Sequence, residues 1–222
     1  QNLKQLTRCQ FYEIGKHMSL DKATLRNLEI TETLYDKRIQ GSLLGVLDKT
    51  GTAMGSRKMK QWLREPLNNA SEINLRLDAV EELTQQPMLE NNLREALKQV
   101  YDFERLTGRI ASGNANGKDL IALKNSVFVL PEIKGGLAYS QSMLLQQLCE
   151  QIHDLAHIYD LIDKAICEDS PYTIKEGGVI KEGYSEELDN IKFSIKDGKQ
   201  WIANLENAER ERTGIRNLKV GF

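Results

Sequence analysis

The segment "HDLAH", residues 153–157, has the side-chain types and the spacing of a metal site. His153 and His157 are four residues apart, so a helix would place both imidazoles on one face, as in the H-E-x-x-H motif of zinc peptidases. Cys149 lies one further turn back, but Asp154 stands where those peptidases carry the Glu that acts as base. Three ligands on one straight helix would also span about 12 Å, too far for one zinc ion with bonds of about 2.0–2.3 Å. We therefore expect exposed histidines on a helix flank, with a two-ligand site as the remaining alternative.

The second candidate is the pair Phe11 and Glu13 in "QFYEIG", residues 10–15. A Phe-x-Glu pair offers an aromatic ring that could wedge into duplex DNA beside a mispaired base. A side chain that inserts between bases in this way belongs to a domain that also binds the groove of the DNA. The same residues are compatible with ordinary chain that leads into a helix, because Asp21 follows as an expected N-cap. The rest of the sequence has to decide between the two interpretations.

Motifs for nucleotide or acyl chemistry are missing from the 222 residues. There is no G-x-x-x-x-G-K-[ST] loop, no G-x-G-x-x-G and no G-x-S-x-G elbow. The nearest match is "GKDL" at residues 117–120, which lacks the upstream glycine and the hydroxyl. We therefore predict that this chain is not itself an enzyme and does not hydrolyse nucleotides.

The elements that would position these residues are almost all helical. Strand-like alternation is limited to "RCQFYEIG", residues 8–15. Residues that cap a helix or favour its first turn mark seven expected starts, at Asp21, Ser42, Ser71, Pro87, Asp102, Asp119 and Ser185. The pattern predicts an all-α fold with at most a short strand at either end.

Two stretches determine how the helical core is expected to be divided. In the helix that begins at Ser71, the apolar Ile73, Leu77, Val80 and Leu83 recur at spacings of four, three and three, so we expect them to face inward. The next stretch holds Pro131 and "KGGLAYS", residues 134–140, and we expect a helix to end at this proline and a break to follow. Residues 140–166 then form, in this interpretation, one continuous helix that carries the two histidines.

The spacing of apolar residues in residues 185–213 predicts one long helix with a single apolar stripe, made of Leu188, Ile191, Ile195, Ile202 and Leu205. Some 28 residues at about 1.5 Å each make a rod of about 40 Å, which is too long to pack on one compact core. Its last turns are polar, and Gly214 is expected to end it. The preceding "TIKEGGVIKEGYS", residues 173–185, is expected to be irregular or a small hairpin, because its glycines permit positive φ.

The composition limits the class of protein further. Apolar residues make up 40% and charged residues 28%, and the net charge is −2, without the basic excess of most proteins that bind duplex DNA directly. The three cysteines are scattered, which indicates a reducing compartment, and we expect a cytoplasmic protein. No apolar run approaches the roughly 18 residues of a membrane helix, so no membrane partner is expected. The absence of an initiator Met suggests a fragment.

Six stretches, in the same order along the chain, resemble the MutS family of DNA mismatch-repair proteins. They are "MSLDKATLRNLEI" (18–30), "SLLGVLDKTGTAMGSRKMKQWLREPL" (42–67), "INLRLDAVEEL" (73–83), "DFERLTGRIASGNANGKDL" (102–120), "GGVIKEGYSEELD" (177–189) and "ERERTGIRNLKVGF" (209–222). The resemblance covers nearly the whole chain from about residue 16. One departure is Lys118, where the family often has Arg.

The resemblance implies a position within a longer protein. Residues 1–15 would end a connector segment, residues 16–139 would form the helical core, and residues 140–213 would form the lever helices with their 173–184 loop. Residues 214–222 would begin a clamp domain that grips DNA. In this setting "FYE" precedes a core signature rather than lying in the family's mismatch reader, so we expect Phe11 and Glu13 to be strand or connector residues.

The mechanism implied by the resemblance is mechanical coupling of the DNA-gripping clamp to an ATPase domain, both outside this chain. We expect Gly177, Gly178, Gly183 and Gly198 to be the hinges, and no catalytic, cofactor or metal residues here. ATP and magnesium would bind the parent's ATPase domain. The implied partners are mismatched duplex DNA, bound through other domains, a second copy of the parent in a homodimer, and mismatch-repair partner proteins. The alternative is a free-standing helical protein–protein interaction module without a DNA role.

Overall fold

The computed structural model describes residues 15–215, 217 and 219, without the side chains of residues 199, 200 and 203. In this part of the chain there are ten α-helices, one short 3-10 helix and two isolated β-bridges, so the predicted all-α class is confirmed. Phe11, Glu13 and most of the strand candidate lie outside the described residues. None of the helices in the described part is both long and apolar enough to span a bilayer.

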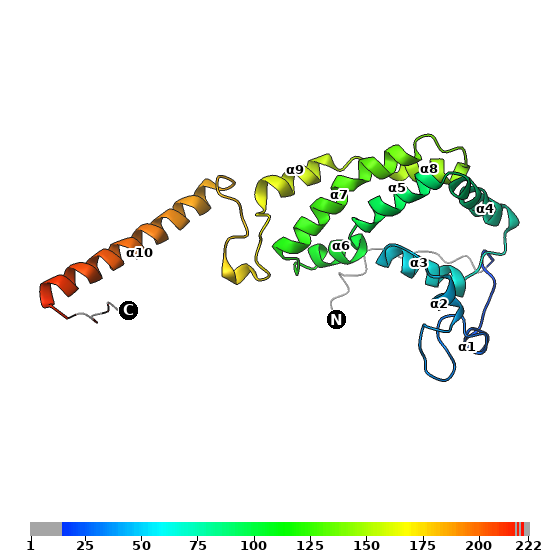
Figure 1. Ribbon diagram of the computed structural model, residues 1–222, viewed down its shortest axis with the longest axis horizontal. Helices are drawn as coiled ribbons and strands as arrows, with labels where there is room; N and C mark the ends of the chain where they lie inside the picture. The colour runs from blue at the N-terminus through cyan, green and yellow to red at the C-terminus, as the bar shows by residue number, and fades with distance from the viewer. Residues whose placement is uncertain (1–14, 216, 218, 220–222) are drawn as a thin grey trace.

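The helices follow one another along the chain, with the longest connections at residues 28–42 and residues 166–185 (Figure 1). They are α1 (Lys22–Asn27), α2 (Leu43–Leu47), α3 (Ala53–Arg64), α4 (Ala70–Gln85), α5 (Pro87–Lys98), α6 (Phe103–Ala111), α7 (Gly117–Leu137), α8 (Met143–Gln151), α9 (Ala156–Ala165) and α10 (Glu186–Thr213), with the 3-10 helix at Ile174–Glu176.

Most of the predicted helix starts are confirmed, because capping is a local interaction. Asp21, Ser42, Asp102 and Ser185 each accept a hydrogen bond from a backbone N–H three residues further on. Pro87 is the first residue of α5. The predicted cap at Ser71 is wrong, because Asn69, two residues earlier, accepts from the N–H groups of residues 71 and 72.

The core is built around α7, which packs against α5, α6, α8 and α9, while α4 packs against α5 and α8. Its main cluster joins buried side chains of four helices, α4, α5, α7 and α8: Ala79, Ala96, Val129, Ile133, Leu137 and Leu145. Gly136 on α7 lies under Leu89 and Leu93 of α5, where an added Cβ would come within 3.3 Å of Leu93 Cδ2. A glycine here therefore lets α5 and α7 approach closely.

The prediction that a helix ends at Pro131 is wrong, since α7 continues to Leu137 with this proline inside it. Proline removes one backbone hydrogen bond, which disfavours a helix interior. The ring of Pro131 is exposed, whereas Val129 and Ile133 on either side of it are buried in the core. Burial on both sides of the proline thus outweighs the local preference to stop.

The predicted inward face of α4 is wrong at three of its four residues. Ile73, Leu77 and Val80 are exposed, whereas Leu83 packs against the core as predicted, together with the buried Ala79. The small side chain of Ala79 lets α4 approach α5 and α8 closely. A prediction based on the large apolar residues of the helix does not identify this contact.

Helix α10 projects away from the core, as the orange and red part of Figure 1 shows. It has 28 residues, and none of its described side chains is fully buried. Gly214 ends it in the left-handed region, at φ 73°. The predicted long projecting helix is therefore confirmed, together with its first and last residues.

Candidate functional site at the base of the long helix

The chain between α9 and α10 turns back against the end of α9 and forms a closed loop. Ile166 and Ile180 make an antiparallel β-bridge. The N–H of Cys167 donates to the carbonyl of Val179, and the N–H of Lys181 donates to the carbonyl of Ala165, both at 2.9 Å. Residues 166–180, called here the base loop, are thus tied together at both ends.

The base loop is also packed into the core. Val179 and Ile180 lie against a buried cluster of Ile162, Ala165 and Ile166 at the end of α9, which Leu120, Ile121 and Leu123 of α7 cover from the other side. The loop therefore shares apolar contacts with the two helices that pack most extensively on each other.

The N-terminus of α7 holds the first part of the base loop. The side-chain amide of Asn116 donates to the carbonyl of Tyr172 at 3.1 Å, and Lys118 Nζ lies 3.4 Å from the centre of the Tyr172 ring. Gly117 lies directly against Ser170, so that a Cβ at residue 117 would collide with the serine side chain. Residue 117 must therefore be glycine because Ser170 packs too close to it for a Cβ, and not because its backbone conformation excludes other residues.

A group of charges crosses the same junction. Lys124 of α7 is 3% exposed, and its ammonium donates to Asp163 of α9 at 3.1 Å and to Glu168 of the base loop. Lys181, just after the loop, lies 3.6 Å from the same Asp163 carboxylate and donates to that residue's carbonyl oxygen. One buried cation thus connects α7, α9 and the base loop.

The pKa values of this group follow from burial and pairing. Burial alone would lower the pKa of Lys124, but hydrogen bonds to Glu168 and Asp163 outweigh it and hold the pKa above its ordinary value. The hydrogen bond from Lys124 lowers the pKa of Asp163. Both groups are therefore charged at neutral pH.

The first turn of α10 is held by a smaller set of polar contacts. The N–H of Gly183 donates to Asp189 Oδ2 at 2.7 Å, and Lys192 Nζ donates to the carbonyl of Ile180 at 3.3 Å. Ser185 caps the helix by accepting from the N–H of Leu188 at 3.3 Å. Residues 181–185 are therefore the one short stretch between the base loop and the helix.

The four glycines expected to be hinges occupy three different settings. Gly177 and Gly178, at φ 74° and 75°, lie inside the base loop. Gly183, at φ 84°, lies between the loop and α10. Gly198 lies in the uninterrupted middle of α10. At all four residues a Cβ would meet no atom of a non-neighbouring described residue within 4 Å, so backbone conformation explains the first three glycines.

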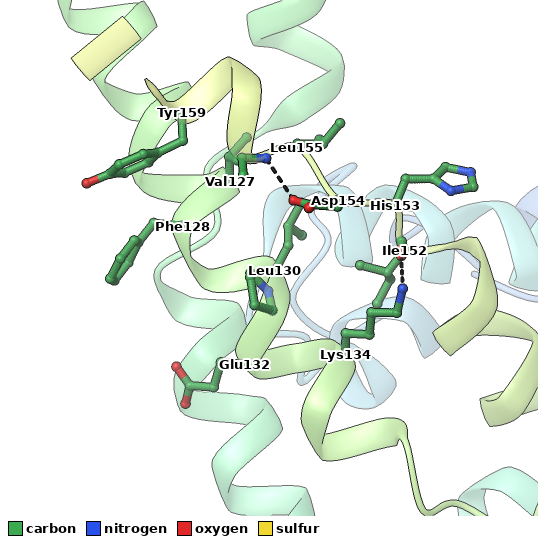
Figure 2. Close-up of a pocket in the computed structure, with 12 residues that line it drawn as sticks. Val127, Phe128, Leu130, Glu132, Lys134, Ile152, His153, Asp154, Leu155 and Tyr159 are labelled. Atoms are coloured by element: carbon green, nitrogen blue, oxygen red, sulfur yellow. Dashed lines mark hydrogen bonds between the residues drawn. The ribbon is translucent and has the colours of Figure 1, made fainter. Parts of the chain in front are cut away.

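The histidine motif does not form the predicted single helix. Helix α8 ends at Gln151 and α9 begins at Ala156, so His153 lies in an extended break while His157 lies on α9. Two polar contacts satisfy backbone groups at the break: Lys134 Nζ donates to the carbonyl of Ile152 at 2.8 Å, and the N–H of Ala156 donates to Asp154 Oδ1 at 2.9 Å (Figure 2). No group of three metal-ligating side chains occurs in the described part of the chain.

The break instead lines an apolar groove with a volume of about 710 Å³ between α7 and the start of α9. Figure 2 shows Phe128 and Tyr159 at one end of the groove and His153 and Lys134 at the other. The two rings are 5.7 Å apart between centroids. Most of the other lining residues are apolar, and the charged side chains of Lys134 and Asp154 bind backbone groups of the break.

Sequence reasoning found the glycines of the base loop but missed the residues that anchor it. Lys124 interrupts the apolar run of α7, which was a signal of a buried pair, but its partners are 39 and 44 residues away in the sequence. Gly117 was treated only as part of an incomplete phosphate motif, whereas its role is to admit Ser170.

Comparison with known proteins agrees with this architecture. Residues 23–218 match the family model described as MutS domain III. The chain is 48% identical to the DNA mismatch repair protein MutS of Acetivibrio thermocellus and 47% identical to that of Clostridium perfringens, in each case over 221 residues and the whole of this chain. The aligned part is 25% and 24% of those proteins, so the chain spans about a quarter of the length of the curated relatives it matches.

Proposed function

Because this chain belongs to the MutS domain III family, we propose that it is the core and lever of a DNA mismatch recognition protein. In this role it couples a clamp that grips DNA to a domain that binds ATP and magnesium, both contributed by other parts of the protein. The DNA is a mismatched duplex, the working form is a homodimer in the cytoplasm, and further mismatch-repair proteins act with it. The chain itself catalyses nothing.

The observation that carries this proposal is the way α10 is attached. The base loop is tied to α9 by backbone bonds and to α7 by Lys124, while α10 is joined to it by residues 181–185 and by the hydrogen bond from Lys192 to the carbonyl of Ile180. A helix of 28 residues at about 1.5 Å each is about 42 Å long, so a rotation of about 10° at its base moves its tip by about 7 Å. A firmly held base with a short connection is what a lever requires.

This attachment favours Gly183 over Gly177 and Gly178 as the hinge. The latter two lie in a loop whose ends are fixed to each other and to the core, so rotation there cannot turn α10 without breaking the bridge at Ile166 and Ile180. Gly183 lies beyond the bridge, where it is spanned by the contacts of Asp189 and Lys192 and by a 3.4 Å hydrogen bond from the N–H of Tyr184 to the carbonyl of Lys181. Hinges are usually a few residues at the end of an element that absorb a change in φ and ψ.

The test is nucleotide-dependent DNA binding by the full-length protein. The measured quantity is the affinity for a mismatched duplex with ATP divided by the affinity without ATP. Gly183→Ala should change this ratio by at least about fivefold relative to the unaltered protein, which is the lower end of typical allosteric coupling. Gly177→Ala is the matched control, because it introduces an alanine at nearly the same positive φ in the same connection. Equal ratios for Gly183→Ala and the unaltered protein would refute this hinge.

The alternative function, a free-standing interaction module without a DNA role, has less support. The relatives that contain this segment are DNA mismatch repair proteins in which it makes up about a quarter of the length.

A further inference from the structure

The first three helices lie outside the core that is built on α7, and they form the dark to light blue part of Figure 1. The buried apolar side chains described in this part of the chain are Ile30 and Leu44, and neither belongs to the two buried clusters of the core. Among the described helices, α3 packs most extensively on α2. Residues 15–69, called here the N-terminal unit, are therefore held to the core by contacts other than those of its two buried clusters.

Arg57 of α3 joins the N-terminal unit to the start of α6. Its two Nη atoms donate to the two carboxylate oxygens of Asp102, at 2.7 and 2.8 Å. Its Nε donates to Glu104 Oε2 at 3.0 Å. Two bonds side by side to one carboxylate need the planar fork of an arginine, and they fix direction as well as distance. This contact therefore sets how α3 lies against α6.

The contact between α3 and α4 is incompletely packed. The guanidinium carbon of Arg76 on α4 lies 3.9 Å from the centre of the Trp62 ring on α3. Beside this pair there is a cavity of about 240 Å³ between the two helices, with Glu65 and Glu72 among its lining residues. The N-terminal unit can therefore change its angle to α4 without separating the side chains of either buried cluster.

Helix α6 has a second arginine–carboxylate pair at its other end. Arg109, in the last turn of α6, lies 3.0 Å from the carboxylate of Asp119 in the first turn of α7. That carboxylate also accepts from the N–H of Asn116, whose side chain donates to the carbonyl of Tyr172 in the base loop. The nine residues of α6 span about 14 Å at about 1.5 Å each. One short helix thus connects the N-terminal unit with the residues that hold the base loop.

We propose that Arg57 is a positioning residue that fixes the angle of the N-terminal unit on α6, and that α6 passes a change in this angle to the base loop. The side chain of Arg57 is 47% exposed, so this contact can open into water. The inference rests on the proposed function, in which a connector precedes the N-terminal unit and the base loop holds the lever. The contact at Arg57 then links the connector to the lever.

The test uses two readouts in the full-length protein, without DNA or nucleotide. Spin labels at Lys22 on α1 and Asn92 on α5, in a protein whose native cysteines have been replaced, measure the distance between the N-terminal unit and the core. Hydrogen exchange measures the protection of residues 166–180. In Arg57→Gln we expect the population outside the unaltered distance peak to rise about fivefold, the factor for losing an exposed ion pair of good geometry. We expect protection of the base loop to fall by at least about twofold, the lower end for a residue that modulates coupling.

Two further variants separate the role of Arg57 from that of charge and of helix stability. Lys60→Gln removes another exposed cation of α3, one that has no hydrogen bond or ion pair within the described residues, and it should leave both readouts unchanged. Arg57→Lys keeps the charge but loses the fork, so it should behave as Arg57→Gln does. In all these variants Asp102 still accepts from the N–H of Arg105, so the cap of α6 is kept.

Four results would overturn the proposal. If the distances in Arg57→Gln match those of the unaltered protein, other contacts set the angle of the N-terminal unit. If the distances change but protection of the base loop does not, α6 does not pass the change on. If Lys60→Gln has the same effect, or if Arg57→Lys restores both readouts, charge alone is responsible. Since neither readout uses DNA or ATP, an unaltered nucleotide response in Gly183→Ala would count against the proposed function alone.

Discussion

Removing the two carboxylates that pair with Lys124 should destabilise the base of the lever more than removing the lysine itself. The reason is unequal burial: Lys124 is 3% exposed, whereas the side chains of Asp163 and Glu168 are 43% and 63% exposed. In Lys124→Met the carboxylates regain water and the cavity stays filled. In the double variant Asp163→Ala, Glu168→Ala a buried ammonium loses both its carboxylate partners.

The magnitudes follow from these burials. Leaving a fully enclosed charge unpaired lowers the free energy of unfolding by about 3–5 kcal/mol. For Lys124 we expect about 2 kcal/mol, because the flexible lysine side chain can move its ammonium group toward water. Lys124→Met should lie within about 1 kcal/mol of the unaltered protein, since similar volume is kept. A variant that combines Lys124→Met with both alanines should recover most of the loss.

The assay is hydrogen exchange of α7 and α9 in the full-length protein near neutral pH. A cost of about 2 kcal/mol corresponds to about a 30-fold loss of protection in the double variant. Without its carboxylates, burial lowers the pKa of Lys124 in the folded state below its unfolded value. The unfolded state of the double variant then binds more protons than its folded state. The loss of stability in this variant, relative to the unaltered protein, should therefore shrink as the pH rises from neutral toward 10. A larger loss for Lys124→Met than for the double variant would refute the reasoning.

Three further predictions concern other parts of the chain. Gly117→Ala should reduce protection of the base loop by an overpacking cost of about 1–3 kcal/mol, while Gly135→Ala on the same helix, where the Cβ meets open space, should be neutral or stabilising. The hydrogen bond from Arg57 lowers the pKa of Asp102 to about 2. The contribution of this pair to folding stability is therefore fully present above the pKa of Asp102 in the unfolded chain, and it is lost as the pH falls through about 2. In Arg57→Gln, an NMR titration of the Asp102 carboxyl should show its pKa return toward 3.8. Phe11→Ala should reduce stability but leave discrimination between matched and mismatched duplexes intact in binding assays.

Features set by a few neighbouring residues could be predicted from sequence. Asp21, Asp102 and Ser185 each cap a helix through a hydrogen bond to a backbone N–H three residues away, and Pro87 is suited to a first turn. The irregular connection before α10 is likewise predicted from its three glycines, all of which have positive φ.

Features set by contacts between distant segments could not be predicted in this way. Helix α7 continues through Pro131 because the residues around the proline are buried by other helices. The break between α8 and α9 depends on Lys134, 18 residues before the carbonyl of Ile152 that it binds. The charges that anchor the base loop also come from three separate segments, so spacing along the chain does not identify which carboxylates pair with Lys124.

The central claim is that α10 moves as a rigid lever about its base when nucleotide binds. The most direct test is the distance between spin labels at Asn92 on α5 and Asn207 near the tip of α10, in a full-length protein whose native cysteines have been replaced. We predict that ATP changes this distance by several ångströms, about 7 Å for a rotation of about 10°, while the distance between labels at Asn190 and Asn207 stays constant. An unchanged distance from core to tip, in a protein that still releases DNA with ATP, would contradict the account.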